Sequence, residues 1–539
     1  MTGGPPGAAT LQSWTGGGVL LRRALHRERV RLPVTVAALA GTAALSAAAT
    51  DALYVDPAER GAAVGAITAS PALLAMYGPL SGDGAAGALA LWKLGVLGAA
   101  AAAVVAVLVV VRHTRAEEDG GRTELVASAG AGRWAPTAAA GLTATTFAAG
   151  LTLVTATALA AAGLGWGGAL AFAATWGGAA LVFAGVGLLT AEIAGSARVA
   201  TTLAVLGVVA AYLVRAVGDA TGGTSTWMVW VSPLGWGERV DPFGARHWWV
   251  LAIPPAVALT LLGAALAVRG RRDLGTGLLH ARPGRAEASP LLRGPVGLAV
   301  HRERGLFAVA TAAFAVVGAV AGSVTSQLGG MLDSVRMRQV VTALGGAHAM
   351  SDAFLVAEFG LLASAASLVV AAAVLRMAAE ERSGRADAVL SAPVGRARWF
   401  LAHLGVAAAG GLVMLAVGGA AAGVTHGTAT TGTEVVRLTA AALAQAPAVL
   451  FVACLAAAGY GLARRSVPLV WLVVAGLVTV AELGPVLGAP SWVLDLSPFT
   501  HVPHLPGGAV DVAAVLATLA VAIVIAGVGA AAFRQRDLA

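Results

Sequence analysis

The sequence predicts an all-α polytopic membrane protein of about 12 transmembrane helices, built as two parallel six-helix repeats. Three observations support this prediction. Of the 539 residues, 58% are hydrophobic and 12% are charged, whereas soluble domains carry about 25% charged residues. Apolar runs long enough to cross a hydrocarbon core of about 30 Å as helices recur along the chain. Several short motifs also occur twice, in the same order.

The apolar runs form two sets of six. They are continuously apolar, unlike barrel strands, which alternate over roughly ten residues. The first set is predicted near residues 32–50, 92–111, 136–160, 169–191, 199–217 and 248–268. The second set is predicted near residues 306–326, 355–375, 400–424, 438–462, 467–487 and 509–533.

The distribution of basic residues predicts the orientation. With the N-terminus inside, 27 of the 35 basic residues fall in segments on the cytoplasmic side. This bias predicts a multi-pass protein of the bacterial cytoplasmic membrane with both termini in the cytoplasm. Because the same arginines account for the basic balance of the chain, no nucleic-acid partner is expected.

The motifs show that the two sets are copies of each other. His-Arg-Glu-Arg at 26–29 recurs at 301–304 before the first run of each set. Glu-Glu-x-x-Gly-Arg-x-acid at 117–124 recurs at 380–387, and each copy leads to a Gly-Arg pair. Six spans per set give both copies the same orientation. We therefore divide the chain into a tail at 1–19, a first half at 20–268, a cytoplasmic linker at 269–300 and a second half at 301–539.

The segments 117–133 and 380–396 are the main candidate site. Each begins with acids, continues with apolar residues and ends in Gly-Arg. Acids favour a helix N-terminus, and glycine suits a helix end. Each segment is therefore predicted to form one short amphipathic helix at the cytoplasmic surface, and 20–31 and 291–304 to form interfacial helices. A loop that only fixes topology would need arginine alone, so a retained mixed-charge pattern favours docking to a partner.

A third repeat lies on the predicted outer side. Trp227 with Ser232-Pro233 recurs as Trp492 with Ser497-Pro498 at identical internal spacing. These residues belong to segments rich in Trp, Pro and Gly at 227–244 and 492–507. Both an outer gate and interfacial anchoring by tryptophan remain open for them.

The chemistry of an energy source is missing from this sequence. A P-loop needs a lysine after its glycines, and Lys93, the only lysine, lies in an apolar run. We therefore expect no catalytic residue, no cofactor in this chain and no ATPase site. No metal site is expected, because the histidines show no repeated ligand spacing. Glu192, Glu358 and Glu482 lie near span ends and are weak candidates for a proton relay.

The order of these elements resembles the type-2 ABC exporter permeases. It is most similar to the duplicated twelve-span group of polyketide-antibiotic (tetronasin-type) exporters of actinobacteria. The resemblance implies that each Glu-Glu loop is a coupling helix for a separately encoded ATPase that binds ATP and Mg²⁺, with two ATPase copies per chain. The residues so implicated are Glu117, Glu118, Arg122, Glu124 and Arg133 in the first half and Glu380, Glu381, Arg385, Asp387 and Arg396 in the second.

The predicted function follows from this resemblance. The chain is expected to be the permease subunit of an ATP-driven exporter of hydrophobic or amphipathic compounds in the lipid bilayer. A proton-coupled twelve-span drug transporter is the alternative, although the Glu-Glu motif matches its Gly-Arg loops poorly. A membrane enzyme or scaffold has little support.

Overall fold

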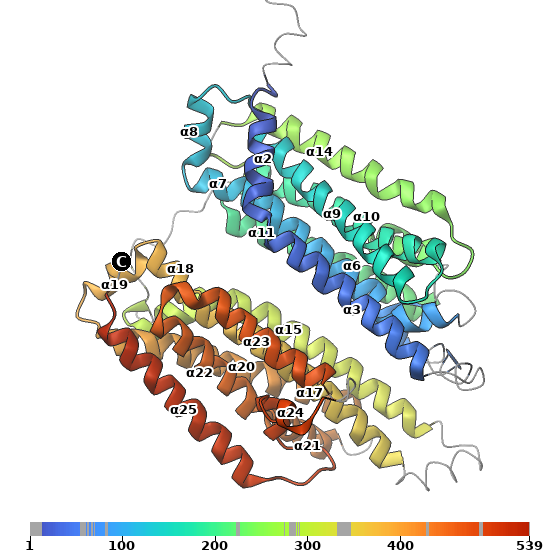
Figure 1. Ribbon diagram of the computed structural model, residues 1–539, viewed down its shortest axis with the longest axis vertical. Helices are drawn as coiled ribbons and strands as arrows, with labels where there is room; N and C mark the ends of the chain where they lie inside the picture. Colours follow the sequence, from blue (N-terminus) through green and yellow to red (C-terminus); the bar gives the residue numbers. More distant parts are fainter. Residues whose placement is uncertain are drawn as a thin grey trace, which may run out of the picture. The chain divides into compact units, whose positions relative to one another are not determined.

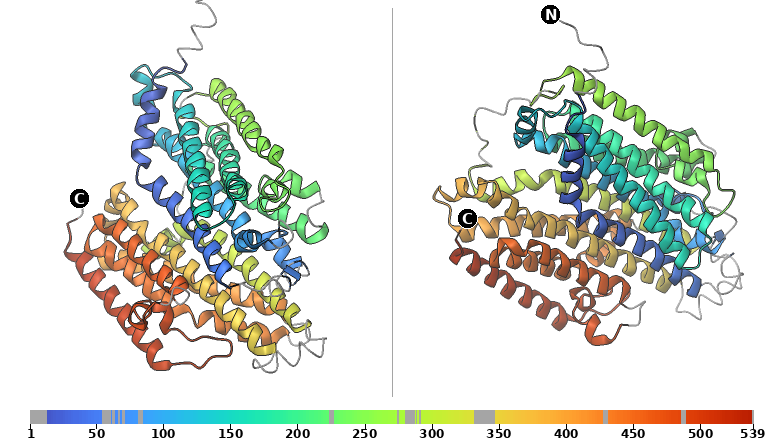
Figure 2. Two further views of the ribbon diagram at one scale, coloured as in Figure 1. Left: turned by 45° about the vertical axis from the view of Figure 1, so that its right-hand side comes forward. Right: turned by 45° about the horizontal axis from the view of Figure 1, so that its top comes forward.

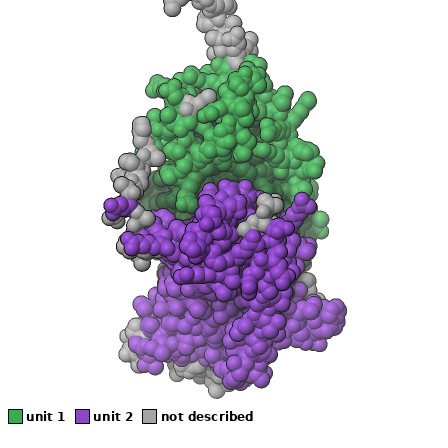
Figure 3. Space-filling model, turned by 90° about the vertical axis from the view of Figure 1, so that its left-hand side faces the viewer, with its two compact units in different colours: residues 1–284 green, residues 285–539 purple. Residues whose placement is uncertain are grey.

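The computed structural model describes residues 13–53, 71–80, 85–222, 227–273, 275–279, 292–330, 347–426, 431–484 and 489–537, with a few single positions between these ranges. All the regular secondary structure assigned in these ranges is helical, as the sequence predicts. The chain divides into two compact units, unit 1 at Met1–Gly284 and unit 2 at Arg285–Ala539 (Figure 3). Each unit is described by itself below.

Unit 1 contains long helices with short helical turns at both ends (Figures 1 and 2). Its elements are α2 (Gly17–Glu28), α3 (Arg31–Leu53), α5 (Pro71–Tyr77), α6 (Ala86–His113), α7 (Arg115–Asp119), α8 (Arg122–Ser128), α9 (Ala135–Ala161), α10 (Trp166–Ile193), α11 (Ala197–Gly222), α12 (Trp227–Val231), α13 (Trp236–Val240), η2 (Trp248–Ala252) and α14 (Ile253–Arg271).

Unit 2 repeats the plan (Figure 1). Its elements are α15 (Pro295–Gly330), α17 (Ala347–Leu375), α18 (Met377–Arg382), α19 (Arg385–Leu390), α20 (Arg396–His426), α21 (Thr431–Leu443), α22 (Ala446–Leu462), η5 (Arg464–Ser466), α23 (Val467–Leu483), α24 (Ser491–Leu494), η6 (Pro498–His501) and α25 (Val512–Gln535). In each unit we call the end that carries the Glu-Glu motif the motif end, and the opposite end the far end.

Within the described residues, 11 helical segments are long and apolar enough to cross a membrane. They correspond to the predicted spans except the eleventh, where the apolar helix Val467–Glu482 is shorter. The predicted span 438–462 is interrupted, because α21 ends at Leu443 and α22 begins at Ala446, one residue before Pro447. Proline lacks an N–H and suits the first turn of a helix, which explains the restart there. The chain is therefore a multi-pass α-helical membrane protein.

The entry into the first span differs between the units. In unit 1, α2 ends at Glu28 and α3 begins at Arg31. Pro33 lies within the first turn of α3, and its ring would clash with the carbonyl four residues earlier if the helix ran straight through. In unit 2 the corresponding position is Ala308, and α15 is one continuous helix of 36 residues. The prediction of a separate interfacial helix at 291–304 is therefore wrong for unit 2.

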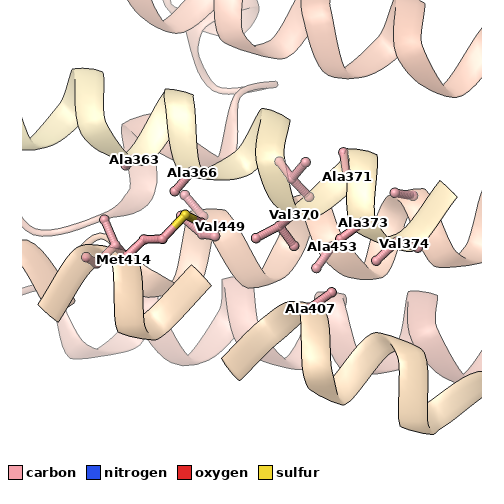
Figure 4. Close-up of a cluster of buried hydrophobic side chains, with 14 of the residues drawn as sticks. Ala363, Ala366, Val370, Ala371, Ala373, Val374, Ala407, Met414, Val449 and Ala453 are labelled. Atoms are coloured by element: carbon pink, nitrogen blue, oxygen red, sulfur yellow. The ribbon is translucent and has the colours of Figure 1, made fainter. Parts of the chain in front are cut away.

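Small residues bring the helices close together. In unit 1, a Cβ at Gly98 would run into the ring of Trp176, whose Nε1 donates to the Gly95 carbonyl at 3.0 Å. In unit 2, Figure 4 shows alanines and valines of α17 facing Met414 and Val449. Close backbone approach of this kind is how helices associate in lipid, where burial of apolar surface supplies little driving force.

Candidate functional site

The Glu-Glu motif forms two short helices in each unit, not one. α7 ends at Asp119 and α8 begins at Arg122, while α18 ends at Arg382 and α19 begins at Arg385. Gly121 (φ 69°) and Gly384 (φ 70°) break the helix in the left-handed region, which glycine adopts without steric cost. The predicted single helix is therefore wrong.

Each of the four short helices carries an acid in its first turn. Glu124 and Asp387 occupy the first turn of α8 and of α19, where the helix dipole favours a negative charge. The paired glutamates precede the break. Glu117 and Glu118 lie in the first turn of α7, and Glu380 lies in the first turn of α18, so acids do lie at helix starts as expected.

The first acid of each pair binds the His-Arg-Glu-Arg motif. Glu117 Oε1 lies 2.6 Å from Arg27 Nη1 in unit 1. Glu380 pairs with Arg302, the equivalent arginine, in unit 2. The two motifs that repeat in the sequence therefore bind each other in both units.

The glutamate of His-Arg-Glu-Arg also forms ion pairs, with residues at the end of the second span of its unit. Glu28 accepts a hydrogen bond from Arg112 at 2.7 Å and lies 3.0 Å from His113 Nε2. Burial opposes the charged form of Glu28, but these two partners outweigh it and lower its pKa. In unit 2, Glu303 accepts from Arg376 at 2.8 Å. Each glutamate thereby links the helical segment that precedes the first span of its unit to the end of the second span.

The second acid of each pair binds the end of the last span. Glu118 accepts two hydrogen bonds from Arg272, at 2.6 and 2.7 Å, one from Arg269 at 3.2 Å and one from Gly275 N at 2.7 Å. The bidentate geometry is the strong form of an arginine–carboxylate pair. Because Arg272 follows α14 directly, Glu118 fastens α7 to the C-terminus of the sixth span.

Unit 2 makes the same connection with different partners. Glu381 accepts from Arg536 at 2.6 Å and from the Tyr460 hydroxyl at 2.8 Å. Arg536 also lies over the Tyr460 ring, 5.0 Å from its centroid. In unit 1 the fourth helix instead contributes Glu192, which accepts from Arg272 Nε at 2.6 Å. This pairing leaves Glu192 as a structural partner of an arginine and not as a free relay carboxylate.

The two retained Gly-Arg arginines hold the same helix ends. Arg133 Nη1 donates to the Gly270 carbonyl at 2.9 Å, and Arg396 Nη1 donates to the Arg536 carbonyl at 2.7 Å. Cations at a helix C-terminus satisfy its last carbonyls and oppose its negative dipole end. Arg133 and Arg396 therefore have a structural role whatever else they contact. Together with the paired acids and their partners, they form what we call the brace of each unit.

The brace leaves a small surface exposed. The side chains of Glu118, Glu380 and Glu381 are only 3%, 8% and 3% exposed, which contradicts their expected direct contact with a partner protein. Glu117 is half-buried. The motif residues at the surface are Arg122, Glu124 and Arg133 in unit 1 and Arg385 and Asp387 in unit 2. In unit 1, Leu125 next to Glu124 is 71% exposed.

The repeated far-end motif also forms matching contacts. Ser232 Oγ donates to the Ala211 carbonyl at 2.7 Å, and Ser497 Oγ donates to the Leu477 carbonyl at 3.1 Å. These bonds fix the two Ser-Pro turns to α11 and α23. Pro233 is half-buried and Pro498 is buried, whereas Trp227 and Trp492 are 68% and 67% exposed.

A buried charge cluster at the far end of unit 1 was missed by the sequence analysis. Arg215 Nη1 lies 2.9 Å from Asp219 and 3.1 Å from Glu238, and Arg215 Nη2 donates to the Ala75 carbonyl at 2.6 Å. Burial raises the pKa of Glu238 to about 8, despite the opposing effect of Arg215. Glu238 also lines a small cavity of about 50 Å³ with Trp92 and Phe172. Only the i, i+4 spacing of Arg215 and Asp219 hinted at this cluster.

Helices of spanning length, with the same brace at the motif end of both units, define a multi-pass α-helical membrane protein built from two related units. A family model for the C-terminal domain of the multidrug efflux system permease Rv1217c matches residues 292–534. The chain is also 36% identical, over 531 residues, to the multidrug efflux system permease protein Rv1217c of Mycobacterium tuberculosis (strain ATCC 25618 / H37Rv), covering 97% of this chain and 96% of that protein. The chain belongs to the family of this multidrug efflux system permease.

Proposed function

We propose that the chain is the permease subunit of an ATP-driven exporter of hydrophobic or amphipathic compounds, including drugs or antibiotics. Membership in a multidrug efflux permease family supports the transport role. The observation that carries the coupling role is the brace, which presents α8 and α19 at the surface in the same way in both units. We infer that separately encoded ABC ATPases dock on these two helices.

Several finer points belong to this proposal. One ATPase copy docks on each unit and holds ATP and Mg²⁺, while the permease chain carries no ATPase site. Both motif ends and both termini face the cytoplasm, in a bacterial cytoplasmic membrane, which the bias of basic residues supports. The tetronasin-type subgroup is the narrower affiliation that the repeated motifs favour.

The brace explains how a docked ATPase would move the spans. α7 is fixed to α2 through Glu117 and Arg27, and to the end of α14 through Glu118 and Arg272. In unit 2 the same positions fix α18 to α15 and α25. Displacing α8 or α19 therefore displaces the first and last spans of that unit together. Buried ion pairs suit this purpose, because their geometry is specific even where their net stabilisation is small.

The far-end segments serve as interfacial anchors in this proposal. Exposed Trp227 and Trp492 suit the headgroup level, where tryptophan is enriched. The serine tethers hold both segments against neighbouring helices. Anchoring needs no motion of these segments, whereas gating would require the tethers to break.

The docking proposal is tested by reversing exposed charges. We expect Glu124→Arg with Asp387→Arg to weaken binding of the ATPase by up to about fivefold at each docking helix, since one charge contact at a rim contributes about 1 kcal/mol or less. Asp495→Arg changes an exposed acid at the far end of unit 2 and is the matched control. Equal recovery of the ATPase with both variants, at equal permease levels in the membrane, would show that α8 and α19 are not the docking helices.

The proton-coupled alternative has a separate test. Efflux of a fluorescent drug is followed in vesicles with an ATPase partner that binds ATP but cannot hydrolyse it. Loss of efflux is expected. Efflux that continues there and stops when the proton gradient is dissipated would refute the ATP-driven mechanism. Family membership does not favour this alternative.

A further inference from the structure

An open groove lies between α15 and α20 in the motif half of unit 2. The two helices pack closely further along, where a Cβ at Gly318 would strike Gly418 and one at Gly322 would strike Ala422. Toward the motif end they leave a groove of about 450 Å³. Its walls are partly exposed, with Val300 49% and Leu401 52% exposed, so the groove opens at the surface of the unit.

The lining of this groove is apolar with one exception. The residues are Val296, Val300, Arg304, Phe307, Leu401, Ala402, Gly405, Val406, Ala409, Gly410 and Val413. Arg304 is the single charged residue among them. It is exposed and makes no ion pair with any residue that the structure describes, whereas Arg302, two positions earlier, is engaged in the brace.

The length of the groove matches one leaflet. Leu401 and Val413 are 12 residues apart on α20, which is about 18 Å at 1.5 Å per residue. The hydrocarbon core is about 30 Å thick, so one leaflet contributes roughly half of that depth. Arg304 lies one turn before Phe307 and is the last charged residue of α15, and a headgroup phosphate is expected beside it.

The straight course of α15 keeps this groove open. Because no proline follows the His-Arg-Glu-Arg motif in unit 2, the helix continues and carries Val296 and Val300 alongside α20. In unit 1, α2 and α3 are separate helices that meet near Pro33. The two halves are therefore unequal at this position despite their common motifs.

We propose that the α15–α20 groove binds one anionic phospholipid of the leaflet at the motif end. One acyl chain lies along the apolar walls over Gly405 and Ala409, and the phosphate pairs with Arg304. Charge complementarity selects this occupant, because an unpaired arginine beside an apolar groove suits an anionic amphiphile and not an apolar helix face. The proposal goes beyond the transport function and does not depend on ATP coupling.

The groove can be filled or neutralised without disturbing the helix pair. A Cβ at Gly405 would meet no atom within 4 Å, so Gly405→Leu projects into free space. Arg304→Gln removes the charge and keeps a polar side chain. Arg29→Gln and Gly41→Leu are the matched controls. Arg29 is the equivalent arginine of unit 1, and a Cβ at Gly41 on α3 would also meet no atom within 4 Å.

The test is native mass spectrometry of the full chain released from nanodiscs of phosphatidylcholine containing phosphatidylglycerol. We expect one retained phosphatidylglycerol per wild-type chain. Arg304→Gln should lower the preference for phosphatidylglycerol over phosphatidylcholine about fivefold, the effect of one arginine near a membrane surface. Gly405→Leu should remove the retained lipid of either kind, and both controls should behave as wild type.

Other results would overturn the proposal. One is a wild-type chain that retains no lipid. Another is that Arg304→Gln and Gly405→Leu retain lipid to the same extent as each other. The third is that the controls lose lipid to the same extent as these two groove variants. A wild-type mass of two permease chains that Gly405→Leu reduces to one would mean that a second copy fills the groove.

Discussion

Replacing Glu118 by glutamine would test the brace at its most buried point. The carboxylate offsets Arg269 and Arg272, and it accepts four hydrogen bonds, including one from Gly275 N. Without its charge, two buried arginines share only Glu192. Removing one partner of a buried ion pair costs about 3–5 kcal/mol. Because glutamine keeps part of the hydrogen bonding, we expect about 3 kcal/mol.

This loss of free energy destabilises the end of α14 and the residues that follow it. Glu118 holds Arg272 and Gly275 directly, and the Thr276 carbonyl accepts from Arg272 and from Arg115. Local opening of this segment exposes the buried Arg272 to trypsin. When opening is fast relative to cleavage, the cleavage rate follows the open population. A loss of about 3 kcal/mol therefore predicts about a 100-fold faster cleavage after Arg272.

Two other acid-to-glutamine variants serve as comparisons for the cleavage rate of Glu118→Gln. Glu124→Gln alters an exposed acid six residues after Glu118 and should leave cleavage nearly unchanged. Glu381→Gln should accelerate cleavage after Arg536 by a smaller factor, since Glu381 faces one arginine and a hydroxyl. Glu118→Gln cleaved as slowly as the wild type would refute the conclusion that Glu118 fastens α7 to α14.

Three further predictions concern other parts of the site. Glu238 has an ordinary pKa of 4.5 and a folded pKa of about 8, so its contribution to stability is complete below about pH 4.5 and is lost as the pH rises through about 8. Thermal unfolding should therefore show a midpoint that falls between about pH 5 and 9, and Glu238→Gln should flatten this dependence; an identical slope in both proteins would contradict the shift. Gly384→Ala should cost about 1 kcal/mol at the left-handed break while Gly384→Asn costs less, as measured by trypsin cleavage after Arg382; equal costs would argue against conformational strain. Arg396→Gln should fray the end of α25 and speed hydrogen exchange there, whereas Arg398→Gln, an exposed neighbour, should not.

The repeated motifs illustrate how far sequence reasoning reaches at the site. It singled out these two loops as the candidate site, because paired acids and Gly-Arg recurred at one constant offset. It assigned all of them to a partner surface. The structure divides them: Arg122, Glu124, Arg385 and Asp387 are exposed, while Glu118 and Glu381 are buried against arginines 154 and 155 positions away. Spacing along a helix reveals near neighbours only, so these distant partners could not be predicted.

The sequence by itself determined the course of most of the long helices and indicated the duplication of the chain. Hydropathy decides the helices, because lipid admits only continuous apolar helices of sufficient length, whereas the duplication rests on the repeated motifs. Only the tertiary structure decided which charges are buried, where the Glu-Glu helix breaks, and that Tyr460 in unit 2 occupies the place that Glu192 has in unit 1. It also placed Arg215 between Asp219 and Glu238, and left a groove beside α15. The physical reason is that a charge in a buried position is stabilised by whichever groups the packed helices bring to it, and that choice is made by contacts remote in sequence.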